Sequence, residues 1–183
     1  SRKEKNFIKR IYHAEAPKWL KYVILFGYPV LLFYITAFMT YNPFVRTRWR
    51  AQILNLLLFE AFVWLLLAIT GSAVIALRTE TILGIALSIA NYYVISFRGS
   101  PVVPWDLLSL GTAASVAGGY DYTLPPRQIA LILLMFFLAF TERYAKIHIS
   151  RKKILLRAGS AVISIACMAG IGWMVQDDAM VSE

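Results

Sequence analysis

Residues 22–40 read YVILFGYPVLLFYITAFMT and carry no charged side chain, and this stretch decides the fold class. A helix needs about 17–25 mostly apolar residues to cross the hydrocarbon core of a bilayer. Residues 81–97 and 158–176 are also uncharged, and residues 51–77 carry a single charge, Glu60. Together with a shorter apolar run within 127–147, the pattern predicts an all-α, polytopic integral membrane protein with five transmembrane helices and additional interfacial helices.

The predicted domain organisation follows from these runs. We expect a basic amphipathic interfacial segment at residues 1–20, because Phe7, Ile8 and Ile11 fall on one helical face; a disordered basic tail is the alternative. The transmembrane domain is expected to fill residues 21–177, with a tight turn at 78–80. Its predicted spans are residues 22–40, 51–77, 81–97, 127–147 and 158–175, and residues 178–183 are predicted to begin an extracellular linker.

The net charge of +9 is distributed in a way that predicts an orientation. If the N-terminus is cytoplasmic, the inner side receives fourteen Lys and Arg residues and the outer side receives five. Cytoplasmic segments carry the excess of Lys and Arg in membrane proteins. The sequence therefore predicts a cytoplasmic N-terminus and an extracellular C-terminus in a cell membrane, with anionic lipid as a partner. We expect no nucleic-acid binding, since no basic patch alternates with aromatic residues on a soluble face.

Few residues within the predicted spans are of the types that bind metals, form disulfides or exchange protons. A lone cysteine, Cys167, allows neither a disulfide framework nor a zinc site. Glu60 is an ionisable group within a span, which is a functional hypothesis by default. It could pair with an arginine, bind a headgroup or carry a proton. The alternative is a hydrogen-bonded structural Glu near the outer third of the membrane, about 15 Å inward from Arg50.

A polar, proline-framed segment follows the third predicted span. Arg98 and Gly99 are expected to end a helix, and Pro101 and Pro104 prevent its continuation. Residues 105–117 are too short to span and are predicted to form an interfacial or re-entrant helix. The candidate headgroup-binding residues of this region are Arg98, Trp105, Asp106 and Tyr122, with Glu60 as a further candidate; a plain connecting loop is the alternative.

The residues of this segment resemble a known family. The runs are Asn91-Tyr-Tyr, Phe97-Arg-Gly-Ser-Pro, Pro104-Trp-Asp-Leu-Leu and Ala117-Gly-Gly-Tyr-Asp-Tyr122. They are similar to the membrane domain of lipoteichoic acid synthase-like phosphoglycerol transferases, which belong to the sulfatase-like, alkaline phosphatase superfamily. The resemblance is specific over about thirty residues, whereas in topology it covers the whole chain.

The resemblance implies a function for a larger protein. In this family, five membrane helices precede an extracellular catalytic domain that uses a threonine nucleophile and Mn or Mg to transfer glycerol phosphate from phosphatidylglycerol, in bacterial cell wall biogenesis. This chain would anchor its own extracellular catalytic domain and present phosphatidylglycerol or a lipid-linked acceptor. No catalytic residue and no metal ligand of the family can be assigned here, so we expect no cofactor and no turnover in this chain. The alternative is a small polytopic binding or transport subunit without a catalytic domain, and an oligomer is possible in either case.

The orientation can be tested by cysteine labelling of intact cells. Single cysteines at positions 121 and 178 should react with an impermeant reagent, because both positions are expected outside. Cysteines at positions 3 and 152 should react only after permeabilisation. Labelling of position 152 from outside would overturn the orientation.

Overall fold

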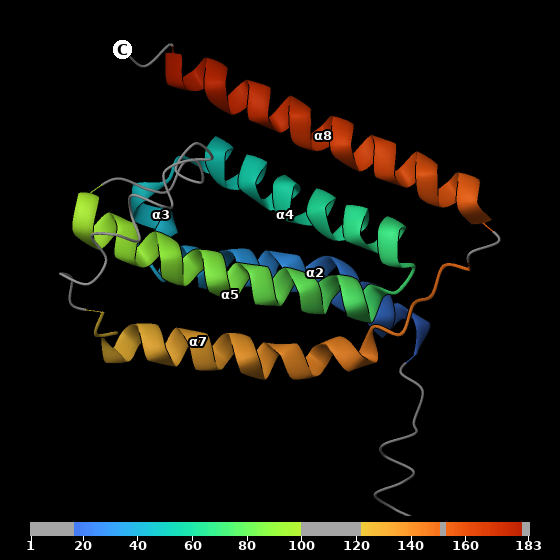
Figure 1. Cartoon of the computed structure of the whole chain (residues 1–183), viewed down its shortest axis with the longest axis horizontal. Coiled ribbons are helices and arrows are strands. Elements are labelled where there is room, and N and C mark those ends of the chain that lie inside the picture. Colours follow the sequence, from blue (N-terminus) through green and yellow to red (C-terminus); the bar gives the residue numbers. More distant parts are fainter. Residues whose placement is uncertain (1–16, 100–121, 151–152, 181–183) are drawn as a thin grey trace, which may run out of the picture.

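The structure is a computed structural model that describes residues 17–99, 122–150 and 153–180, with side chains described up to residue 174. These residues form a bundle of long helices that lie side by side and alternate in direction (Figure 1). The predicted all-α polytopic membrane fold is confirmed. The predicted interfacial helices at residues 1–20 and 105–117 lie almost entirely outside the described residues. The elements are α2 (Lys18–Phe38), α3 (Pro43–Arg46), α4 (Trp49–Thr70), α5 (Ala73–Arg98), α7 (Pro126–Ala139), the 3₁₀ helix η3 (Phe140–Tyr144) and α8 (Ile154–Met180).

Four of the described helices are long and apolar enough to cross a membrane: α2, α4, α5 and α8. The predicted span at residues 127–147 is not one continuous α-helix. It consists of α7, which has 14 residues, and η3, which continues it for 5 more. At rises of about 1.5 and 2.0 Å per residue, the two together extend about 31 Å, close to the hydrocarbon thickness. A crossing by α7 and η3 is therefore geometrically feasible, and the count of five spans stays a prediction.

The predicted turn at residues 78–80 is wrong. The chain reverses instead at Gly71 and Ser72, so α4 ends at Thr70 and α5 runs without interruption from Ala73 to Arg98. Gly71 adopts a positive φ of 74°, and its amide donates to the Leu67 carbonyl, which is how glycine commonly ends a helix. Arg78 and Glu80 are consequently helical residues within the bundle, and the predicted spans 51–77 and 81–97 are out of register with the helices.

The connection from η3 to α8 packs against this reversal. The amide of Ile149 donates to the Gly71 carbonyl (2.8 Å), and the amide of Ala73 donates to the Ile147 carbonyl (3.0 Å). These bonds satisfy backbone groups at the reversal, where no continuous helix can satisfy them. We call this part of the bundle the Gly71 end, and we call the part where α5 finishes the Arg98 end.

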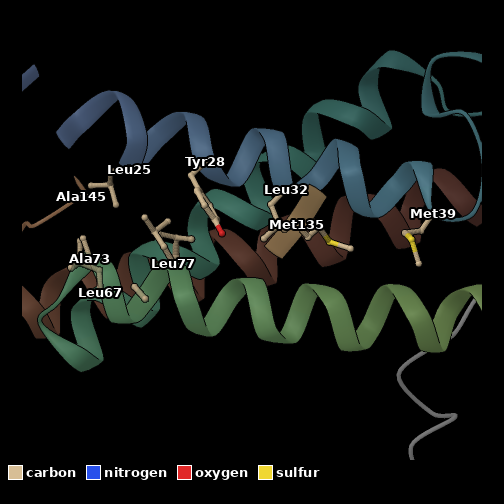
Figure 2. Packing of buried hydrophobic residues seen from close by; sticks show 11 residues of the cluster. Leu25, Tyr28, Leu32, Met39, Leu67, Ala73, Leu77, Met135 and Ala145 are labelled. Atoms are coloured by element: carbon tan, nitrogen blue, oxygen red, sulfur yellow. The ribbon is translucent and has the colours of Figure 1, made fainter. Parts of the chain in front are cut away.

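The apolar core lies between α2, α4, α5 and α7. Figure 2 shows Leu25, Leu32, Leu67, Leu77 and Met135 among its buried side chains, with the hydroxyl of Tyr28 directed into the interior. Helix α8 packs chiefly against α4, as Figure 1 shows, and most of its described side chains are exposed. In a membrane, exposed apolar side chains of this kind contact lipid.

Gly71 provides a stability test with an internal reference. A Cβ at position 71 would lie 2.9 Å from the Ile149 carbonyl oxygen, whereas no described atom lies within 4 Å of a Cβ at Gly99, which has the same backbone conformation. Gly99→Ala should lower the free energy of unfolding by about 1–2 kcal/mol, because L-residues are strained at positive φ. Gly71→Ala should lower it further, since it adds the steric clash. Thermal unfolding in detergent measures both, and equal losses would contradict the packing of the 145–150 connection on the reversal.

Candidate functional site

The carboxylate of Glu142 is the centre of a buried polar network. Glu142 lies on η3 and is 0% exposed. Its Oε1 accepts hydrogen bonds from the Tyr28 hydroxyl of α2 (2.7 Å) and the Thr81 hydroxyl of α5 (2.8 Å), and the two hydroxyls also contact each other. Its Oε2 accepts from Nε of Arg78 (3.3 Å). Three helical segments that are far apart in the sequence therefore meet at one side chain.

The pair between Arg78 and Glu142 is asymmetric. The Arg78 side chain is 60% exposed, whereas that of Glu142 is fully buried. The long aliphatic part of an arginine can extend along an apolar surface while the guanidinium stays near water. The position of Arg78 near the start of α5 suits this arrangement, because the Gly71 end lies less than two helical turns away. Arg78 thus compensates the charge of a carboxylate that is itself removed from solvent.

Glu80 is a second buried carboxylate on α5, and it is 2% exposed. Neither of its oxygens has a hydrogen-bond partner among the described residues. Glu80 interacts electrostatically with Glu60 on α4 and with Glu142 on η3. Three acidic residues from three segments therefore interact electrostatically inside the bundle, and we call Glu60, Glu80 and Glu142 the carboxylate cluster.

Glu60 lies at the midpoint of α4, eleven residues after Trp49 and ten before Thr70. The sequence predicts a place near the outer third of the membrane, about 15 Å inward from Arg50. Glu60 is half-buried, and its Oε2 is buried without a hydrogen-bond partner in the described part of the chain. The structure thus brings Glu60 next to another acidic residue, and no described arginine pairs with it.

One member of the cluster, Glu80, lies in the wall of an apolar pocket. A cavity of about 220 Å³ between α4, α5 and α8 has Glu80 in its wall. Its other lining residues are apolar, and they are Leu58, Phe59, Phe62, Leu83, Gly84, Leu87 and Met168. Among the residues described, no group of three or more His, Cys, Asp or Glu side chains could hold a metal ion. Proton binding and hydrogen bonding are therefore the chemistry that these carboxylates support best.

Glu80 and Glu142 were not predicted as site residues from the sequence. The pattern predicts a tight turn at residues 78–80, and Glu142 falls in the last part of the predicted span 127–147 with no role assigned to it. One signal was present: the run from residue 72 to residue 97 is apolar on both sides of Arg78 and Glu80. Two charges inside such a run indicate a span with buried ionisable groups. Nothing in a single sequence indicates that Glu142 contacts Tyr28, because 114 positions separate them.

Two of the predicted headgroup residues, Arg98 and Tyr122, lie at the Arg98 end of the bundle. Arg98 is the last residue of α5, and Gly99 follows it with a φ of 76°, as the predicted helix end requires. Tyr122 lies beside that helix end, since the Tyr93 hydroxyl donates to the Tyr122 carbonyl and the Phe97 ring meets the Tyr122 ring edge-on at 5.6 Å. Trp105 and Asp106 lie outside the described residues. The structure thus brings Tyr122 to the end of α5 that carries Arg98.

Glu60 does not belong to this group. Glu80, with which it interacts, precedes Arg98 by eighteen residues on the same helix, which is about 27 Å at the helical rise. The five predicted site residues therefore do not form one site: Glu60 is part of the carboxylate cluster, and Arg98 and Tyr122 lie at the Arg98 end.

Comparisons of the chain with protein-family models, with curated proteins and with solved structures gave no match.

Two tyrosines of α2 test the Glu142 network. Tyr28→Phe removes a 2.7 Å hydrogen bond to a buried carboxylate and should lower the free energy of unfolding by about 1.5–3 kcal/mol. Tyr34→Phe is the matched control, because the hydroxyl of Tyr34 makes a long 3.4 Å contact with Gln52 and should contribute about 0.5 kcal/mol or less. Unfolding of both variants in mixed micelles gives the comparison. Equal effects of the two substitutions would show that the Glu142 network does not stabilise the bundle.

Proposed function

We propose that the chain is the membrane domain of a lipoteichoic acid synthase-like phosphoglycerol transferase, and that its Arg98 end presents phosphatidylglycerol or a lipid-linked acceptor to a catalytic domain outside the membrane. One observation carries the proposal. The two ends of the segment that resembles this family, as far as the structure describes them, are in contact with each other. Residues 91–99 and Tyr122 belong to that segment, and the contacts of Tyr93 and Phe97 with Tyr122 hold its flanks together at one end of the bundle.

The aromatic residues at this end fit a position at the membrane interface. Tyr93 stacks on Phe97 (5.8 Å between ring centroids) and packs edge-on against Tyr122 (5.2 Å). Tyrosine is enriched at the headgroup level of membrane proteins, where its ring contacts lipid and its hydroxyl reaches polar groups. Arg98 follows directly on the same helix, and a guanidinium matches the geometry of a lipid phosphate with two parallel hydrogen bonds.

The path of the chain agrees with this proposal. Helix α8 begins at the Gly71 end, where Arg157 donates to the Ala68 and Ile69 carbonyls of α4, and it runs toward the Arg98 end (Figure 1). A domain attached after α8 would therefore emerge on the side of the membrane that Arg98 faces. The proposed orientation, with the Arg98 end outside the cell, places the candidate headgroup site and such a domain on the same surface.

A second candidate is a small binding or transport subunit without a catalytic domain, and the carboxylate cluster favours it. Buried ionisable residues commonly mark ion pathways or proton relays in transporters. The reading frame after residue 183 separates the two candidates. A downstream sulfatase-like domain supports the phosphoglycerol transferase, and a stop codon supports the subunit.

Lipid retention tests the role of Arg98. Native mass spectrometry of the purified chain should show bound phosphatidylglycerol in preference to a zwitterionic phospholipid. Arg98→Ala should reduce this retention about tenfold, which corresponds to a loss of about 1.4 kcal/mol of binding free energy. In the full-length enzyme, the same variant should lower turnover at limiting phosphatidylglycerol while expression stays normal.

The matched control is Arg46→Ala, which removes another exposed arginine from the same end of the bundle. It should leave retention nearly unchanged, because it lies outside the resembling segment. Equal retention by the wild type and Arg98→Ala would refute headgroup binding at Arg98. Equal losses of lipid in Arg98→Ala and Arg46→Ala would refute a specific site as well, because any exposed arginine would then attract anionic lipid equally.

A further inference from the structure

Glu80 has an unusual environment for an acidic residue inside a membrane protein. It is 2% exposed, and neither carboxylate oxygen has a hydrogen-bond partner in the described residues. Its side chain forms part of the wall of the 220 Å³ pocket, whose other lining residues are apolar. An isolated carboxylate is very costly in such a medium, and real proteins reduce this cost by binding a proton or a cation.

The groups that face Glu80 do not neutralise it. Helix α4 contributes the carboxyl group of Glu60, η3 contributes Glu142, and α2 contributes the hydroxyl of Tyr28, which also interacts electrostatically with Glu80. On its own helix, Arg78 is two residues away, but its Nε pairs with Glu142. From α8, the side chain that lines the pocket is the apolar Met168.

Two neighbouring carboxyl groups in a medium of low dielectric constant cannot both be ionised without a large repulsion. Glu60 and Glu80 interact electrostatically across α4 and α5, and three of their four oxygens are buried without partners in the part of the chain described. A proton bound to either group removes the repulsion and supplies a hydrogen-bond donor. A metal ion would need several convergent ligands, and the described side chains form no such group.

We propose that Glu60 and Glu80 form a reversible proton-binding pair within the membrane, which the hydrocarbon phase reaches through the pocket between α4, α5 and α8. The pair carries one proton more than two free carboxylates would. Glu142 is not part of the pair, and its carboxylate accepts hydrogen bonds from Tyr28, Thr81 and Arg78. The proposal does not depend on lipid binding at Arg98, since that residue lies about 27 Å away along α5.

A hydrophobic carbodiimide, dicyclohexylcarbodiimide, tests the protonation and the route of access together. The reagent needs a protonated carboxyl group: the proton moves to a carbodiimide nitrogen, and the carboxyl oxygen bonds to the central carbon. Treatment of the protein in lipid vesicles, followed by peptide mass spectrometry, should show an adduct on the peptide that contains Glu80. Above the midpoint of the pH profile, the initial rate of labelling should fall about tenfold per pH unit, as the protonated fraction does.

Variants and reagents separate the proposal from its alternatives. Glu80→Gln should lose the adduct, and Glu60→Gln should move the midpoint of Glu80 labelling to lower pH, because it removes the neighbouring negative charge. The Glu142 peptide should stay unlabelled and is the internal control. A water-soluble cationic carbodiimide should label Glu80 far more slowly than the hydrophobic one.

Three results would overturn the proposal. One is the absence of an adduct at Glu80 in folded wild-type protein at acid pH. Another is a labelling rate that does not change with pH. The third is equal labelling of Glu80 by the two reagents, which would show a water-filled site open to the aqueous phase. All three are measured on the wild-type chain, so they stand even where a variant does not fold.

Discussion

A single carboxylate, that of Glu142, fixes how the helices of this protein fit together. Apolar packing gives little directional preference in a membrane, because lipid chains are as apolar as the side chains that they replace. A buried carboxylate is different, since it requires donors at defined positions. Tyr28, Thr81 and Arg78 provide them from α2 and α5, so the rotation and the height of both helices relative to η3 are set by one group. Two polar residues of α5, Arg78 and Thr81, find their partner through this arrangement.

The ends of the helices obey a related constraint. The last carbonyl groups of a helix lack partners within the helix, and water is scarce near the hydrocarbon. Arg157 supplies donors to Ala68 and Ile69 at the end of α4, and Arg127 and Gln128 do the same for Phe38 and Met39 at the end of α2. Basic residues near membrane surfaces are usually attributed to anionic lipids and to topology. Here two of them, Arg157 and Arg127, also complete the hydrogen bonding of a neighbouring helix.

Hydropathy was sufficient to predict the fold class, since an uncharged apolar run as long as 22–40 is typical of a helix that crosses a bilayer. The ends of the helices were harder to predict. The helix end at Arg98 and Gly99 was predicted, whereas the equivalent end at Gly71 was overlooked, because the charges at Arg78 and Glu80 indicated a turn in water. A charged residue in the sequence indicates a water-exposed position only where the folded protein does not bury its side chain. The partner of Arg78 is 64 positions away, and a single sequence does not reveal it.

The candidate site, too, could be predicted from the sequence only in part. Glu60 was recognised because it interrupts an otherwise apolar run, and Arg98 and Tyr122 because they stand in an unusual polar segment. Glu80 and Glu142 were not recognised, since each lies close to an arginine in the sequence and fits the pattern of a water-exposed connection. Their burial depends on long-range packing, which follows from the folded bundle and not from local composition.

The attachment of α8 to α4 has a consequence for the order in which the protein assembles. The Glu142 network and the apolar core draw on α2, α4, α5, α7 and η3, all of which are synthesised before α8. We therefore expect the preceding helices to associate in the bilayer while α8 is still being made, and α8 to dock last on a surface that is already complete. In such an order, the docking of α8 closes the pocket beside Glu80 last, because Met168 supplies the wall that α4 and α5 leave open.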